Sequence, residues 1–221
     1  LGEIKSWDHP EIKALNPRLQ LPRLPIVPVV RSDNSGSTKT FTTYLSRSSP
    51  RWATDIGVHG LPAWPVGVVP AKGSEGVRDT VIKTSGSLGY IGYNYVTKDR
   101  LNGVQLKNRA GHFVRANEAA FAESVRASGM ANAVSSQFSL IDQVGSGSWP
   151  ITETTYVLFE RVPKNPESTK LALKFFFWAF QHGDNMARDT GFIPLPPALQ
   201  SRVVRLFNEV RDDRGSPLNF Y

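Results

Sequence analysis

The clearest potential for chemistry lies in the polar loop of residues 31–37, which is followed at once by a helix pattern. A glycine-containing loop at the start of a helix exposes unpaired backbone N–H groups and the positive end of the helix dipole, and both attract anions. Ser35 and Ser37 would add hydroxyl donors. Arg31 could donate two parallel hydrogen bonds to one oxyanion. The loop therefore predicts a site for a small anion.

Asp33 stands two residues after the arginine, close enough in sequence to orient its guanidinium. An alternative interpretation also fits: the serines only cap the helix, and Arg31 is a solvated edge residue. These residues alone leave both interpretations open. A nucleotide-binding P-loop is not favoured, because that motif has glycine directly before its lysine, whereas Thr38 precedes Lys39.

Two predicted elements would hold this loop. Residues 26–30 form a short, β-branched run that follows Pro22 and Pro25, which indicates a strand. Phe41, Tyr44 and Leu45 follow at helical spacing, and the pattern stops near Pro50. We therefore expect a strand, then the polar loop, then a helix.

A second unit of this kind begins at residues 72–76, where a glycine-containing loop precedes Val77, Val81 and Ile82 at helical spacing. We expect Ser74 to cap this helix. The alternative is a second loop that faces an anion. Residues 88–93 then indicate a glycine-rich strand.

The rest of the chain also mixes strands and helices. The patterns predict a hairpin over 102–114, a helix over 117–128, a strand over 154–159, and helices over 167–182 and 197–210. The aromatic run 175–178 indicates a buried helix, and the Gly-Ser segment 145–148 is the best candidate for a linker. This order predicts an α/β fold with sheets covered by helices.

Charge favours an anionic partner, since 26 lysines and arginines oppose 19 acidic residues and give a net charge of +7. The basic residues form no run of five or six, so the charge pattern does not favour nucleic acid. There is no cysteine, and the four histidines form no metal-binding pattern. No catalytic constellation is evident. We therefore predict a binding protein that is not an enzyme and has no cofactor or metal.

Taken in order, the motifs resemble the periplasmic phosphate-binding proteins of ABC-type phosphate importers. The resemblance covers essentially the whole chain. It is carried by residues 7–8 with 15–17, 30–38 with Phe41, Tyr44 and Leu45, 64–67, 72–77, 86–91 with Tyr93, 149–152, 173–176 with 178–179, and 217–218 near Tyr221.

The resemblance implies a type II periplasmic-binding-protein fold, with two α/β lobes and a ligand cleft. It implies that the protein binds inorganic phosphate in the periplasm and delivers it to the permease subunits of an ABC transporter. By the same resemblance, the phosphate ligands fall on Arg31, Ser35, Gly36 and Ser37. Asp33 falls where the family keeps an aspartate that pairs with the arginine. Threonine is commoner at position 37, but serine retains the hydroxyl and the N–H.

Members of that family carry a considerable N-terminal stretch before the segment that matches Leu1. It holds the other lobe's phosphate ligands, among them an acidic residue that accepts a proton from phosphate and excludes sulfate. We expect this stretch to be missing here or supplied by another chain. Residues 1–148 would then form most of the second lobe, and 149–221 the C-terminal part of an incomplete first lobe. The alternative functions are a receptor or sensor for a related oxyanion such as sulfate, and a truncated form with weak or no phosphate binding.

Overall fold

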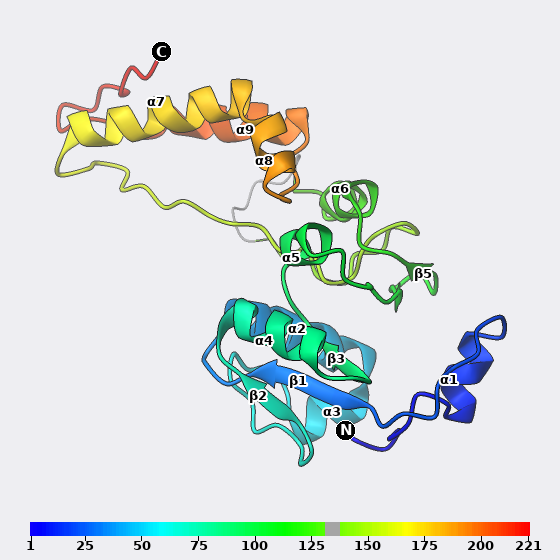
Figure 1. Ribbon diagram of the computed structural model, residues 1–221. Coiled ribbons are helices and arrows are strands. Elements are labelled where there is room, and N and C mark those ends of the chain that lie inside the picture. The colour runs from blue at the N-terminus through cyan, green and yellow to red at the C-terminus, as the bar shows by residue number, and fades with distance from the viewer. Residues whose placement is uncertain (131–137) are drawn as a thin grey trace. The chain divides into compact units, whose positions relative to one another are not determined.

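The computed structural model describes residues 1–130 and 138–221 (Figure 1). The chain divides into two compact units, Leu1–Leu101 and Asn102–Tyr221, and each is described by itself. None of the helices in the described ranges combines the length and the apolar character that crossing a membrane requires.

The N-terminal unit is built on a parallel three-stranded sheet in the order β2-β1-β3. Its strands are β1 (Val27–Arg31), β2 (Val69–Ala71) and β3 (Ser87–Gly89). The central strand β1 confirms the strand expected at 26–30, shifted by one residue. The strand expected over 88–93 is shorter than predicted, because it ends at Gly89 and the helix α5 (Tyr93–Lys98) begins soon after.

Helices cover this sheet. The helix α4 (Gly73–Lys83) contacts all three strands, and its Val77 is fully buried against Val29 and Ala71. The helix α2 (Gly36–Ser48) confirms the helix expected after the polar loop, and α3 (Pro50–Asp55) follows it directly with Ser49 as its N-cap. A short helix, α1 (Pro10–Leu15), precedes the sheet and is capped by His9.

The strand β3 approaches α4 so closely that glycine is required at position 89. A Cβ atom placed on Gly89 would lie 2.9 Å from Val77 Cγ1 and 3.0 Å from Val81 Cγ2. These valines belong to the core of the unit and have little freedom to move. The absence of a side chain at Gly89 thus sets the distance between β3 and α4.

The C-terminal unit contains a short hairpin and four helices among its described residues. The hairpin pairs β4 (Leu106–Lys107) with β5 (Phe113–Val114), as expected for 102–114. The helices are α6 (Glu118–Ala127), α7 (Pro166–His182), α8 (Asp184–Asp189) and α9 (Pro197–Phe207). Three of them confirm predicted helices, whereas α8 was not predicted.

The strand predicted over 154–159 is wrong. These residues form no strand, and Leu158 is 91% exposed. The β-branched and aromatic pattern indicated a strand, but a strand forms only when a neighbour accepts and donates its backbone hydrogen bonds. No strand of the described residues pairs with this segment.

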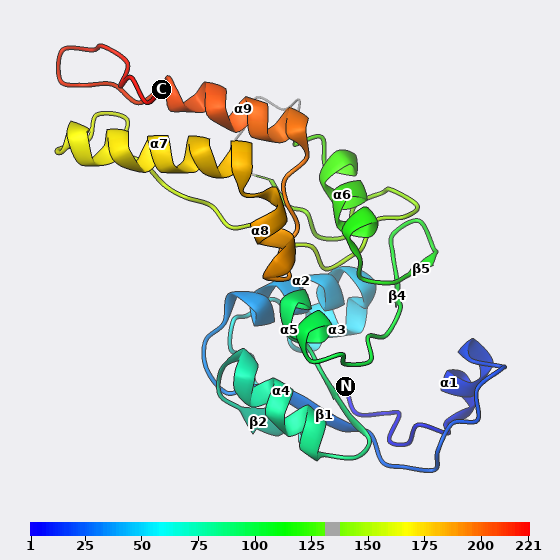
Figure 2. The same ribbon diagram turned by 45° about the horizontal axis from the view of Figure 1, so that its top comes forward.

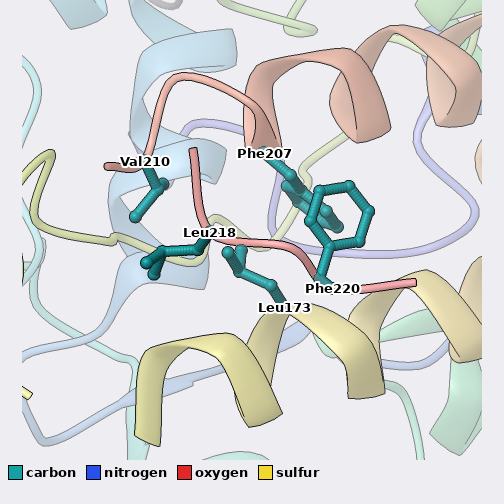
Figure 3. Close-up of a cluster of buried hydrophobic side chains, with 5 residues drawn as sticks. All are labelled: Leu173, Phe207, Val210, Leu218 and Phe220. Carbon is teal, nitrogen blue, oxygen red and sulfur yellow. The ribbon is translucent and has the colours of Figure 1, made fainter. Parts of the chain in front are cut away.

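The helices α7 and α9 lie side by side (Figure 1 and Figure 2) and enclose the main core of this unit. Leu173 of α7 points toward Phe207 of α9 and toward Phe220 near the C-terminus (Figure 3). The other side of α7 is exposed, with Phe175 58% and Trp178 44% accessible. The prediction of a buried helix is therefore correct for one face of α7 only.

The Gly-Ser segment 145–148 is a packed turn within the C-terminal unit. The side-chain amide of Asn108 lies 3.3, 2.8 and 3.2 Å from the carbonyl oxygens of Gly145, Ser146 and Ser148. Ser148 is fully buried. The division of the chain into lobes at 148/149 stays a prediction.

We predict that Gly89→Ala lowers the free energy of unfolding of the N-terminal unit by about 1–3 kcal/mol, the usual cost of overpacking a core. The matched control is Gly76→Ala in α4, where a Cβ would meet only ordinary contacts of 3.6 Å or more. That change should be neutral or stabilise by up to about 1 kcal/mol. Urea unfolding followed by tryptophan fluorescence measures both, since Trp7, Trp52 and Trp64 belong to this unit. Equal effects of the two changes would contradict the close packing of β3 on α4.

We also predict that Leu173→Ala destabilises the C-terminal unit by about 2–5 kcal/mol, because it leaves a cavity in the core. Phe175→Ala, on the exposed face of the same helix, should cost less than about 1 kcal/mol. Thermal unfolding followed by circular dichroism compares the two variants. A larger loss for Phe175→Ala would reverse the assignment of the two faces.

Candidate anion-binding site

The predicted site lies at the carboxyl ends of the three parallel strands. Arg31 is the last residue of β1 and stands opposite Ala71 at the end of β2. Tyr90 is the first residue after β3. In open α/β sheets ligands bind at this edge, because the loops that follow the strands converge there. The sheet topology thus places loop 31–37, loop 72–74 and Tyr90 together.

The side chain of Arg31 is fixed by Asp33 at two points. Arg31 Nε donates to Asp33 Oδ1 over 2.8 Å, and Nη2 donates to Oδ2. Asp33 Oδ1 also accepts the backbone N–H of Gly73 over 3.0 Å. The Arg31 side chain is only 13% exposed and that of Asp33 34%. The predicted pair is present, and it also connects the first loop to the start of α4.

The same contacts explain the electrostatics of the pair. The pKa of Asp33 lies far below its usual range, because Arg31 donates to the carboxylate and, second, because Gly73 does. The pKa of Arg31 is raised, mainly by its hydrogen bond to Asp33. Both groups are therefore charged across the neutral range, and the guanidinium is held in one plane.

A count of donors shows what remains for a ligand. A guanidinium has five N–H donors. Asp33 takes two, and Arg31 Nη1 donates a third to Ser74 Oγ over 3.4 Å. The other two, one on Nη1 and one on Nη2, have no partner among the described residues, and two such donors can bind two oxygens of a tetrahedral anion. Two N–H groups of Arg31 are therefore available to a ligand.

Ser74 does not cap α4, contrary to the prediction. The N-cap is Lys72, without a side-chain hydrogen bond, and the helix begins at Gly73. Gly73 has a φ of +68°, a left-handed conformation that glycine adopts without strain, and its N–H reaches Asp33. Because the helix starts two residues earlier than a Ser74 cap would place it, the Ser74 hydroxyl is available to accept from Arg31. The two glycine-containing loops therefore meet at one side chain.

The start of α2 supplies further donors. Ser35 is the N-cap, and its Oγ accepts the N–H of Thr38 over 3.4 Å. Gly36 and Ser37 are the first two residues of the helix, and an α-helix provides no internal partner for its first N–H groups. Gly36 is exposed and Ser37 half-buried. Helix capping and anion binding, stated above as alternatives, are compatible here: Ser35 caps the helix while the next two residues present their N–H groups.

Sequence reasoning missed Tyr90 as a contributor to this site. It offered Gly73 and Ser74 only within the alternative of a second anion-facing loop at 72–76, where helix capping was the favoured interpretation. Tyr90 accepts the backbone N–H of Arg31 over 3.2 Å from 59 positions away in sequence. No local pattern could have indicated that contact. In the described part of the chain, no cluster of three or more His, Cys, Asp or Glu side chains is placed to hold a metal ion.

Comparison with known proteins places the chain in a family. A family model described as "PBP superfamily domain" matches residues 1–182. The chain belongs to the PBP superfamily. The predicted loop 31–37, the sheet and the helix α7 all lie within the matched region of this PBP-superfamily chain.

Individual relatives that resemble this chain are phosphate-binding proteins by name. The phosphate-binding protein PstS of Haemophilus influenzae is 36% identical over 203 residues, which are 92% of this chain and 60% of the relative. The PstS of Pasteurella multocida is 35% identical over 219 residues, 99% of this chain and 63% of the relative. The PBP-superfamily chain thus spans about three fifths of the length of these relatives.

Solved structures share the fold. A DING protein superposes with a TM-score of 0.65 at 18% identity. The superposed region covers 93% of this chain and 63% of the DING protein. PfluDING, a high-affinity periplasmic phosphate-binding protein bound with phosphate, gives a TM-score of 0.60 at 22% identity, with 93% and 62% covered. The predicted type II periplasmic-binding-protein fold is confirmed for this PBP-superfamily chain.

The Arg31–Asp33 pair predicts a pH dependence of stability. Folding lowers the pKa of Asp33 below its unfolded value of about 3.9. The contribution of ionised Asp33 to the free energy of unfolding is therefore complete above that pH. It is lost as the pH falls through the pKa of Asp33 in the folded state. The difference in unfolding free energy between the wild type and Asp33→Asn should be constant at neutral pH and shrink below about pH 4.

Urea unfolding at a series of pH values measures this difference. The control is Asp55→Asn, which removes a carboxylate on α3 that is 47% exposed. It should change stability by less than about 1 kcal/mol at each pH. A difference for Asp33→Asn that persists unchanged into strong acid would exclude the ion pair as its source.

Proposed function

We propose that this chain binds inorganic phosphate through Arg31, Ser35, Gly36 and Ser37, without catalysis. The observation that carries the proposal is that two N–H donors of the fixed Arg31 guanidinium have no partner among the described residues, in the loop that leads into α2. A tetrahedral oxyanion placed there would receive two hydrogen bonds from Arg31. It would also receive N–H bonds from Gly36 and Ser37 and would lie at the positive end of the helix dipole.

Directed hydrogen-bond donors, rather than net charge, support a site for an anion. Asp33 neutralises Arg31, so the site has little net charge of its own, and its attraction for an anion comes from directed donors. Charge-assisted hydrogen bonds contribute about 1.5–3 kcal/mol each, and rigid donors lose little entropy when they bind. The relatives add support, since they are named phosphate-binding proteins and one solved structure is bound with phosphate.

The wider role follows from the same proposal. We propose that the protein acts outside the cytoplasm as the receptor of an ABC-type importer and passes phosphate to the permease subunits. The net charge of +7 suits a protein that attracts anions. Residues 1–148 and 149–221 are proposed as parts of two lobes that enclose the ligand.

The test is a two-dimensional NMR titration of the 221-residue chain with phosphate, a method that detects millimolar as well as micromolar binding. We expect the backbone amides of Gly36 and Ser37 to shift and saturate. Arg31→Ala should weaken binding by about 100-fold or more, because two charge-assisted bonds are lost. Asp33→Asn should weaken it less, since it loosens the guanidinium without removing a donor.

Arg51→Ala is the matched control, because it removes the same charge from the same unit at a site that is 62% exposed. Its affinity should stay within about twofold of the wild type. Amides at the start of α2 that do not respond to phosphate would refute phosphate binding by this chain. An Arg31→Ala affinity within threefold of the wild type would remove Arg31 from the site. A parallel titration with sulfate distinguishes phosphate from a related oxyanion as the ligand.

A further inference from the structure

The hydroxyl of Tyr90 contacts both ends of the polar loop. Tyr90 Oη accepts the backbone N–H of Arg31 over 3.2 Å and lies 2.7 Å from Thr38 Oγ1. Arg31 ends β1, and Thr38 is the third residue of α2. The segment between them contains Asp33 and the proposed phosphate ligands. One oxygen atom therefore joins the strand before the loop to the helix after it.

The position of that hydroxyl is itself fixed by packing. The Tyr90 ring stacks on Phe41 of α2, with centroids 4.5 Å apart and planes 20° apart. The centroid of the Trp64 ring lies 6.2 Å from that of Tyr90. Thr38 is fully buried, so its hydroxyl has little freedom to rotate away. Gly89 precedes Tyr90 and is held opposite Val29 in the sheet register.

Two constraints are needed to place the guanidinium, and they come from different residues. Asp33 fixes the side-chain plane of Arg31 through Nε and Nη2. That pairing does not itself join the end of β1 to α2, because Asp33 lies within the loop between them. The Tyr90 hydroxyl makes that connection, since it bonds to Arg31 and to Thr38 at once.

We propose that Tyr90 is a positioning residue of the anion site, whose hydroxyl aligns the Arg31 guanidinium with the N–H groups at the start of α2. The effect on affinity rests on the proposed phosphate function, whereas the alignment of Arg31 does not. A different role is that only the Tyr90 ring matters, as part of the aromatic cluster with Phe41 and Trp64. Tyr90→Phe separates the two roles, because it keeps the ring and removes the hydroxyl.

The first measurement needs no ligand. In Tyr90→Phe the backbone amide of Arg31 loses its acceptor, so its proton resonance should move upfield and its hydrogen exchange should become faster. The control is Tyr156→Phe in the C-terminal unit, where Tyr156 is 52% exposed. That variant should leave the Arg31 amide unchanged. An unchanged Arg31 amide in Tyr90→Phe would overturn the inference.

The second measurement is phosphate affinity in the same two variants. We expect Tyr90→Phe to bind phosphate about tenfold more weakly, the effect typical of losing a group that orients a ligand-binding side chain. Tryptophan fluorescence and the midpoint of urea unfolding confirm that the Tyr90→Phe protein is folded. Tyr156→Phe should bind as the wild type does. Equal affinities for Tyr90→Phe and the wild type would overturn the positioning role.

A double-variant cycle tests whether Tyr90 acts through Arg31. Arg31→Lys retains a charge but lacks the fork that needs alignment, so Tyr90→Phe should cost much less affinity in that background. A full tenfold loss in both backgrounds would show that Tyr90 acts independently of Arg31 and would overturn the inference. If phosphate binds to no variant while the Arg31 amide responds in Tyr90→Phe, the proposed function fails and the alignment of Arg31 is supported.

Discussion

The paired hydrogen bonds between Arg31 and Asp33 are the interaction on which the candidate site depends. An unpaired arginine samples many rotamers and loses that freedom when it binds a ligand. Here the carboxylate holds the guanidinium side-on, which leaves its end edge facing away from Asp33. The carboxylate also cancels the charge of the arginine. The guanidinium is therefore held in a fixed orientation, but the pair carries no net positive charge. The positions of the N–H donors then decide which ligand the site binds.

The sheet supplies the rest of the arrangement, because its three parallel strands end at the same edge. The register of β1 with β2 brings Arg31 next to Ala71 and the turn into α4, where Gly73 donates to Asp33. The register of β1 with β3 brings Tyr90 to the same point. Each contact joins loops that are far apart in sequence. The close packing at Gly89 also supports this arrangement, since a side chain there would push β3 away from α4.

Local features of the sequence were sufficient to predict the strand–loop–helix unit around residues 31–37 and the Arg31–Asp33 pair. Ser74 could not be predicted in the same way, because capping and a bond to Arg31 require the same residue type and only the helix start decides between them. Tyr90 depends on strand register, which a single sequence does not reveal. The strand predicted over 154–159 failed for a related reason: propensity describes a segment, whereas a strand needs a partner. The outer face of α7, with Phe175 and Trp178, shows that apolar character alone does not determine which face is buried.

The donors and acceptors of this loop also limit which anions it can distinguish. Phosphate at neutral pH carries a proton, whereas sulfate does not, so a site that separates them needs an acceptor aimed at the ligand. Asp33 is the carboxylate of the loop, and its oxygens already accept from Arg31 and Gly73. Protonating Asp33 would break the pair that orients the guanidinium, and its strongly lowered pKa opposes this change. Within the loop, the side-chain acceptors that remain for a proton of the ligand are neutral: hydroxyl oxygens such as that of Ser37, and the amide oxygen of Asn34. The loop is therefore suited to recognise a tetrahedral oxyanion by shape and donor count, and strong discrimination by protonation state requires an acceptor from outside residues 31–38.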